Sequence, residues 1–317
     1  MTVSIIIPNY NGGELLKKNL PKVFDAAKYH TQTFNQDIEI ILVDDSSTDN
    51  SVQEIQNLTL RLRSGRELKI IQNEKNLGFS STANRGVKEA TGEIVVLLNT
   101  DVIPQKNFLE PLIEHFKEPK VFAVGCMDKS IEGENTVLRG RGIGKWERGF
   151  LVHARGEVDR TTTLWVSGGS GAFRKSIWDI LGGFNELYNP FYWEDIDLSY
   201  RALKSGYKVI FEQKSIVVHK HEEGVIKKKY SPSQIKTIAY RNQFIFVWEN
   251  ATDLDLQFFH LFWLPYHFIK SLLRGDLAFF LGFFQAFVLL PKIIQSSFRI
   301  QQGFIKKDNE VVKEFIA

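Results

Sequence analysis

Cysteine is almost absent from this chain, and so are long apolar runs and an excess of either charge. Cys126 is its one cysteine, which excludes an intramolecular disulfide and a cysteine-based metal cluster and fits a reducing compartment. The 40 Lys and Arg residues nearly balance the 37 Asp and Glu residues, giving a net charge of +3, so we expect no nucleic acid partner. No stretch of about 20 uninterrupted apolar residues appears, so we expect no transmembrane helix.

The first residues, MTVSIIIPNYNGG, lack a basic segment, and their apolar run is short. We therefore expect no secretory signal. With 43% hydrophobic and 24% charged residues over 317 positions, the composition is that of an ordinary globular protein.

Short β-branched apolar runs alternate with helix-compatible segments over the first 125 residues. This alternation predicts an α/β fold with a mostly parallel sheet and helical crossovers. Ligands bind beyond the carboxyl ends of the strands in such sheets, and polar residues follow three of the runs at that end. The predicted strands are Val3–Ile7, Ile38–Val43, Leu68–Ile71, Ile94–Leu98 and Val121–Gly125.

The rest of the chain divides by composition into two further parts. Residues 126–165 are less regular and rich in Gly and Arg, which indicates loops and short strands. Ser231–Asn250 has a helical pattern, with Pro232 near its start, where helices tolerate proline. We expect one domain built from halves 1–125 and 126–250, followed by a helical extension over 251–317.

Carboxylates and an amide follow two of the predicted strands. Asp44 and Asp45 end the second strand; Asp49 suits a cap for the next helix, and Asp45 suits contact with a ligand. Asn99 and Asp101 follow the fourth strand two residues apart, so that both side chains can face one site. Such oxygen ligands suit Mg²⁺ or Mn²⁺ bound together with phosphates; a polar turn with Asp101 as a helix cap is the alternative.

A second polar cluster lies later in the chain. Glu194 and Asp195 follow Trp193 beside further aromatic residues, and a partly desolvated carboxylate has a raised pKa suited to a general base. The alternative is an acid-rich helix N-terminus, and Asp197 suits that role. His219 or His221, after a β-branched run, can supply a nitrogen ligand to a metal.

Taken together, these motifs resemble family 2 of the glycosyltransferases, the inverting enzymes with the GT-A fold. The resemblance covers roughly residues 1–250 and is strongest to the rhamnosyltransferase-like and galactofuranosyltransferase-like bacterial branch that builds surface polysaccharides. The motifs that carry it are Ser4–Asn11, Val43–Ser47, Asn73–Phe79, Asn84–Gly86, Asn99–Asp101, Ser167–Gly169, Trp193–Asp195 and His219.

The resemblance implies a nucleotide-sugar donor site. Tyr10 would stack on the nucleobase in a pocket shaped by Pro8, Asp45 would hydrogen-bond the base, and Asn84 would lie near the donor. Asp101 matches the last acid of the family's Asp-x-Asp metal motif. This chain has Asn99 at the first position of that motif, so Asn99 is expected at the donor and not on the metal.

The resemblance also implies the catalytic and acceptor residues. Asp195 matches the base of the Glu-Asp motif, with Glu194 beside it. His219 matches a late histidine that completes the Mn²⁺ or Mg²⁺ site with Asp101. Gly168 and Gly169 match a turn near the acceptor, and Trp193 would offer a ring face to a sugar.

These matches imply an inverting glycosyltransferase that moves a sugar from a UDP- or dTDP-sugar to a hydroxyl of a glycan or lipid-linked acceptor. The implied role is cell-surface polysaccharide synthesis. A non-catalytic binding or assembly subunit is one alternative. A nucleotidyltransferase is another, but Asn9–Gly13 lacks the basic phosphate loop that such an enzyme needs after its first strand.

The C-terminal extension is rich in phenylalanine and basic residues. Eleven Phe lie between Leu256 and Phe304, and 256–307 contains six Lys or Arg against one acid, Asp276. An aromatic stripe of Phe280, Phe283, Phe284, Phe287 and Ile294 with basic flanks suggests a helix in a membrane interface; packing on the domain or on a second subunit is the alternative. We expect a cytoplasmic protein, peripheral at the inner face of the plasma membrane.

Overall fold

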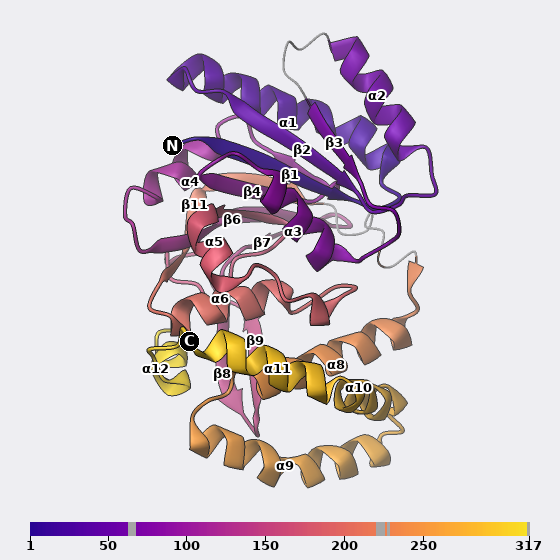
Figure 1. The fold of residues 1–317 in the computed structure, drawn as a ribbon, viewed down its shortest axis with the longest axis vertical. Helices are drawn as coiled ribbons and strands as arrows, with labels where there is room; N and C mark the ends of the chain where they lie inside the picture. Colours follow the sequence, from indigo (N-terminus) through magenta and orange to yellow (C-terminus); the bar gives the residue numbers. More distant parts are fainter. Residues whose placement is uncertain (63–67, 220–225, 227–228, 316–317) are drawn as a thin grey trace.

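The computed structural model describes residues 1–62, 68–219, 226 and 229–315, and it has the predicted α/β architecture (Figure 1). One mixed sheet runs through the domain in the order β3-β2-β1-β4-β10-β6-β11-β5, and β7 extends it by pairing with β6. All five predicted strands form, as β1 (Val3–Asn9), β2 (Ile38–Asp44), β3 (Leu68–Gln72), β4 (Ile94–Leu98) and β6 (Val121–Glu132).

The first four of these strands pair in parallel through helical crossovers, as the alternating pattern predicts. Both faces of β1 are buried because α1 covers one face and α3 the other (Figure 1). Ile5 packs in one apolar cluster with Leu20 of α1, while Ile6 packs in the other with Val87 of α3. The crossover helices are α1 (Gly13–Phe34), α2 (Ser51–Leu62) and α3 (Phe79–Glu89).

The two predicted halves of the domain share this sheet. Antiparallel β10 (Ser170–Arg174) lies between β4 and β6, and β6 itself crosses the boundary at 125/126. Residues 126–165 form short strands and loops, as predicted, except that β6 continues to Glu132; two antiparallel pairings follow it. The other elements here are β5 (Val102–Pro104), α4 (Leu109–His115), β7 (Asn135–Arg139), β8 (Gly142–Glu147), β9 (Phe150–Arg155), α5 (Lys175–Leu181), the 3₁₀ helix η1 (Glu186–Tyr188), α6 (Glu194–Lys204) and β11 (Lys208–His219).

The C-terminal part is helical, as predicted, and gathers at the end of the molecule opposite α1 and α2 (Figure 1). Its first helix, α8 (Pro232–Asn250), has a capping box in which Ser231 and Gln234 satisfy each other's backbone N–H groups. The following helices are α9 (Leu254–Leu273), α10 (Leu277–Val288), α11 (Leu290–Gln301) and α12 (Asp308–Lys313).

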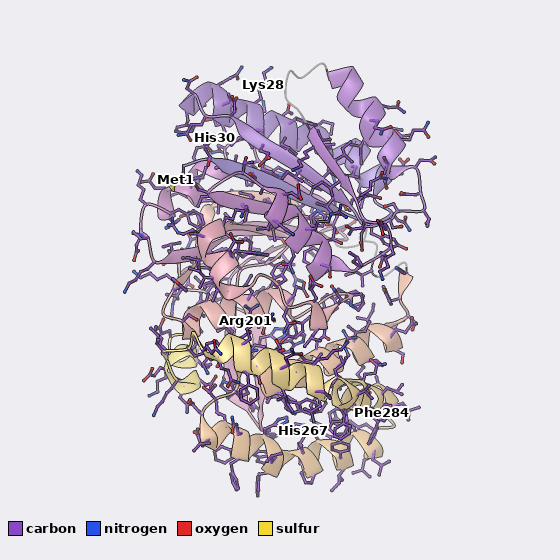
Figure 2. The ribbon with its side chains drawn as sticks, viewed as in Figure 1. Met1, Lys28, His30, Arg201, His267 and Phe284 are labelled. Carbon is purple, nitrogen blue, oxygen red and sulfur yellow. The ribbon has the colours of Figure 1, made fainter. Side chains whose placement is uncertain are left out.

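Buried polar contacts fix this helical part to α6. Lys204 and Asp308 form an ion pair of 2.8 Å with no exposure of either side chain. Arg201, labelled in Figure 2, pairs at 2.8 Å with Asp197, which also accepts a hydrogen bond from Asn250 of α8. The C-terminal helices are therefore tied to the helix that begins at Glu194.

The predicted aromatic stripe does not form one continuous face. The chain bends by 66° between α10 and α11, so Ile294 lies on a different helix from the four phenylalanines. Phe283 packs against Phe244, Trp248 and Phe268, whereas Phe284 and Phe287 are exposed. Among the described residues, no single helix has the length and hydropathy of a membrane span, and α10 with α11 meets that test only as a bent pair.

Candidate active site

A cavity of about 520 Å³ lies at the carboxyl ends of the parallel strands, where the sheet order predicts a ligand site. It brings together residues that are far apart in the sequence. Those among its lining that the sequence predicts are Pro8, Tyr10, Asp45, Asn99, Asp101, Gly168, Gly169, Glu194, Asp195 and His219.

Tyr10 and Asp45 lie where β1 and β2 end, at one side of the cavity. Asp45 is buried, and its carboxylate accepts hydrogen bonds from Asn73 Nδ2 at 2.7 Å, Leu77 N at 2.9 Å and Gly78 N at 2.9 Å. This carboxylate thereby holds the loop before α3 in place, and Oδ2 retains acceptor capacity because one protein donor contacts it. Asp44 has a different role, since it accepts from Asn9 and Ser47.

Asp101 and His219 meet because β5 and β11 pair antiparallel, with His219 opposite Val102. His219 Nε2 lies 3.2 Å from Asp101 Oδ2, and Nδ1 lies 3.1 Å from Asp128 Oδ2. Burial lowers the pKa of His219, but hydrogen bonds and charge attraction from the two carboxylates outweigh it and raise the pKa to about 9. The alternative of Asp101 as a helix cap is excluded, because α4 begins at Leu109.

The carboxylate oxygen of Asp101 and the imidazole nitrogen of His219 are atoms of the kind that bind a divalent cation. Two ligands bound at about 2.1 Å in an octahedral shell lie about 3 Å apart, close to the 3.2 Å between these two atoms. Asp128 on Nδ1 matches the outer carboxylate that usually orients a ligating histidine. The described residues contain no cluster of three or more side chains able to hold a metal, so the fit extends to two protein ligands. His221 lies outside the described residues.

Glu194 and Asp195 begin α6 and border the same cavity. Burial raises the pKa of Asp195, and backbone N–H groups of Gly168 and Ile196 oppose that rise. Burial, together with the charge of Asp195, raises the pKa of Glu194 well above its ordinary value. Burial therefore opposes ionisation of both carboxyl groups, and more strongly for Glu194 than for Asp195.

The glycine turn at Gly168 and Gly169 lies against both halves of the site. Gly168 N donates to Asp195 Oδ2 at 3.3 Å, so the turn positions the carboxylate. A Cβ on Gly169 would come within 2.5 Å of Asn99 Nδ2, so a larger residue there would displace the Asn99 side chain.

Comparison with known proteins identifies the family. Residues 4–181, more than half of the chain, match the family model described as glycosyl transferase family 2. This chain belongs to glycosyl transferase family 2.

Two relatives illustrate the range of family 2 proteins that it resembles. It is 24% identical over 226 residues to O-antigen chain rhamnosyltransferase RfbN of Salmonella typhimurium, which covers 70% of this chain and 67% of RfbN. It is 28% identical over 162 residues to pre-mycofactocin glycosyltransferase of Mycobacterium tuberculosis, which covers 49% of this chain. The chain spans about a third (33%) of the length of that relative.

Solved structures share the fold at low identity. S. aureus TarS 1-349 in complex with UDP-GlcNAc has a TM-score of 0.59 at 17% identity, covering 99% of this chain and 91% of TarS 1-349. GalNAc-T7 with UDP, GalNAc and Mn²⁺ has a TM-score of 0.62 at 18% identity, covering 80% of this chain and 48% of that one. The family 2 chain therefore has the GT-A fold that the sequence motifs imply.

Two residues predicted to contact substrates do not border the cavity of this family 2 protein. Asn84 bonds the backbone of Phe184 in both directions, at 2.8 Å and 2.9 Å, and so braces the segment before η1. Trp193 is buried and packs against His153 and Phe246. Within this structure both are supporting residues, and their predicted donor and acceptor contacts stay predictions.

Sequence reasoning missed three features of the family 2 site. Asp128 is not among the residues that the sequence predicts for the site, although it follows the apolar run of β6 as Asp101 follows that of β4. Lys229 lies 4.1 Å from the centroid of the Tyr10 ring, a contact that depends on tertiary structure. Glu132 and Arg139 form an ion pair at the cavity, and the hairpin that joins them has no functional motif.

Proposed function

We propose that this chain is an inverting glycosyltransferase that moves a sugar from a UDP- or dTDP-sugar to a hydroxyl group. The observation that carries the proposal is a single cavity that holds a general-base carboxylate, Asp195, together with a metal-type pair, Asp101 and His219. Relatives whose printed names are glycosyltransferases support it. So do similar structures with UDP-GlcNAc, or with GDP-Man and Mn²⁺.

The chemical step is a direct displacement at the anomeric carbon. Asp195 removes the proton from the acceptor hydroxyl as its oxygen bonds to that carbon. The bond from the carbon to the diphosphate oxygen breaks, the nucleoside diphosphate leaves with the electron pair, and the configuration inverts. The raised pKa of Asp195 makes it a stronger base than an ordinary carboxylate.

Glu194 serves the same step as a neutral acid. Its Oε2 is buried without a hydrogen-bond partner among the described residues, and the residue borders the cavity. A protonated carboxyl there donates to the acceptor without competing with Asp195 for its proton.

Asp101 and His219 would hold Mn²⁺ or Mg²⁺, with Asp128 fixing the ring of His219. Such an ion, when bound, neutralises charge on the departing diphosphate. The two protein ligands leave the remaining positions to donor phosphates and water, as is usual for Mg²⁺.

The nucleobase lies against Tyr10 and Pro8, with Asp45 at its hydrogen-bonding edge. Lys229 lies above the Tyr10 ring, with Nζ 4.1 Å from its centroid. The base and Lys229 contact the same aromatic residue, so donor binding shifts Lys229 or places it over the base. Asn99 lines the region between this pocket and Asp101.

The acceptor is a glycan or a lipid-linked sugar, consistent with relatives named for O-antigen synthesis. We place the protein in the cytoplasm, peripheral at the inner face of the plasma membrane through 256–307. Exposed apolar residues of α9 and α10 support this placement.

A panel of UDP-, dTDP- and GDP-sugars tests the function. Thermal shift with Mn²⁺ identifies the donor, because a ligand of the native state raises its stability. Donor hydrolysis or transfer is then measured, with Asp195→Asn as the control that keeps donor binding. A protein that binds none of the nucleotide-sugars and hydrolyses none is not the proposed enzyme.

A further inference from the structure

Between Phe258 and the end of α9, no fully exposed side chain is charged, and Lys270 is half-buried at the border of this face. Every exposed residue in that stretch is apolar or aromatic, and Leu273, Leu272 and Leu261 are 82%, 70% and 66% exposed. Large exposed apolar patches mark binding sites for proteins or membranes. The α9 face consists of Phe258, Phe259, Leu261, Phe262, Pro265, Tyr266, Ile269, Leu272 and Leu273.

A second cavity, of about 240 Å³, opens beside the α9 face and lies between the β8–β9 hairpin, α8 and α9. Arg148, Lys270 and Arg274 border it, and we refer to it as the cationic cavity. His267, labelled in Figure 2 between these elements, borders it as well. Figure 2 also places Phe284 of α10 at the outer surface of the same helical part.

The positive charge of the cationic cavity is not neutralised within the described part of the chain. No ion pair joins Arg148, Lys270 or Arg274 to an acid there. The two acids on the cavity wall are already paired, Glu147 with Lys145 and Asp276 with Lys236, at 2.7 Å in each case. The cavity therefore presents three cations to solvent.

Tyr266 arranges two of these cations. Arg148 Nη1 donates to its hydroxyl at 2.9 Å, and Lys270 Nζ lies 5.6 Å from the centroid of its ring. Tyr266 and Lys270 lie four residues apart on α9, and Arg274 follows four residues later as the C-cap of that helix, so the three residues continue one stripe.

The hairpin turn that carries Arg148 is fixed to α9. The carbonyl of Arg148 accepts from His267 Nε2 at 2.8 Å, and that of Gly149 bonds His260 Nδ1 at 2.7 Å. Gly149 has φ +79, and a Cβ there would come within 2.5 Å of His260 Cα. The arginine is thus held beside the lysine before any ligand binds, which reduces the ordering cost of binding.

We propose that the cationic cavity binds the phosphate of an anionic phospholipid when the α9 face inserts into a bilayer. Arg and Lys are the usual phosphate ligands, and an apolar face with a cationic border suits an anionic lipid surface. A second copy of the chain fits poorly, because a symmetric contact would bring the same cations together. The inference rests on the membrane contact of the proposed function and adds its lipid class and residues.

Vesicle sedimentation with the full chain tests the site. Phosphatidylcholine vesicles with phosphatidylglycerol should bind the wild type more tightly than phosphatidylcholine alone. The double variant Arg148→Gln/Lys270→Gln should lose about 25-fold in affinity for the anionic vesicles, at about fivefold per cation. Its weaker binding to phosphatidylcholine should be unchanged.

A matched control removes the same charge elsewhere. Lys292→Gln/Arg299→Gln on α11 alters two exposed cations near exposed Ile294 and Phe298, and it should keep most of the binding. Equal losses of affinity in the two double variants would show a general effect of charge and would overturn the assignment of phosphate binding to the cationic cavity. Phe258→Ser/Phe262→Ser should lose binding to both vesicle types; binding like the wild type would overturn insertion of the α9 face.

Two further measurements separate other outcomes. Inorganic phosphate that displaces the wild type from anionic vesicles at low millimolar concentration would assign the cavity to free phosphate and overturn the lipid source. Donor binding, followed by thermal shift, should be equal in the wild type and all variants, which shows that they fold. A chain that binds no nucleotide-sugar but keeps lipid selectivity would refute the transferase and leave this site intact.

Discussion

His219 is held between two carboxylates, with Nε2 3.2 Å from Asp101 Oδ2 and Nδ1 3.1 Å from Asp128 Oδ2. The outer carboxylate fixes the ring so that the other nitrogen faces the cavity. Asp128→Asn keeps the shape of the side chain but removes its charge, so we expect the affinity for Mn²⁺ with donor to fall about 10- to 100-fold. Calorimetry with a nucleotide-sugar measures this change.

Glu212→Gln is the matched control for Asp128→Asn. Glu212 bonds His115 at 2.6 Å and does not border the cavity. Its substitution should leave donor and metal binding unchanged. If both variants lose affinity alike, the Asp128 effect is one of general stability.

The two acids at the start of α6 should respond differently to amide substitution. Asp195→Asn removes the general base and should lower kcat by about 10²- to 10⁴-fold while donor binding persists. Glu194→Gln should cost far less, because burial and the charge of Asp195 raise the pKa of Glu194 and so favour its neutral form. Steady-state kinetics of both variants compares them, and a larger loss for Glu194→Gln would reverse the assignment of the base.

Glu249 makes the stability of the protein depend on pH. Burial and the charge of Asp197 raise its pKa from 4.5 to about 8. The folded state therefore holds a proton that the unfolded chain releases, so the free energy of unfolding falls as pH rises from 4.5 to 8 and then levels off. Glu249→Gln should make this fall shallower, with the remainder coming from Glu194 and Asp195, whose pKa values burial also raises; urea unfolding at several pH values measures the change.

The comparison for Glu249→Gln is Glu14→Gln on the exposed first turn of α1. That variant should keep the pH dependence of the wild type. A Glu249→Gln profile that follows the wild type throughout would show that Glu249 is ionised in the folded protein.

The buried pair of Lys204 and Asp308 should matter more for stability than exposed pairs do. Asp308→Ala leaves the Lys204 ammonium buried without its paired carboxylate and should lower the free energy of unfolding by about 3–5 kcal/mol. Replacing both partners, as Lys204→Met/Asp308→Leu, should cost less. Urea unfolding measures the stability of these variants. Glu89→Ala, which removes the exposed ion pair with Lys69, is the control and should be nearly as stable as the wild type. A double variant as unstable as Asp308→Ala would contradict this explanation.

The sequence predicted the elements whose signals are local. The β-branched runs gave the parallel strands, and Ser231 with Pro232 gave the start of α8. Because ligands bind beyond the carboxyl ends of parallel strands, Tyr10, Asp45 and Asp101 were expected together at one edge of the sheet. Each of these inferences needed only the pattern within a short segment.

What the sequence missed depends on tertiary pairing. Asp128 joins the site because β6 and β11 run parallel, and no local pattern reveals that neighbour. Trp193 and Asn84 match family motifs but do not line the cavity, so their substrate contacts stay predictions. The exposed apolar surface of the C-terminal part lies mainly on α9, whose sequence has neither a clear apolar stripe nor an uninterrupted apolar run. Phe283, which belongs to the predicted aromatic stripe, is half-buried.

The most direct test is calorimetric titration of the wild type and Asp101→Ala with the donor found in the nucleotide-sugar screen, with and without Mn²⁺. We expect Mn²⁺ to strengthen donor binding to the wild type and to have no such effect on Asp101→Ala. Mn²⁺-dependent binding that is unchanged in Asp101→Ala would contradict it.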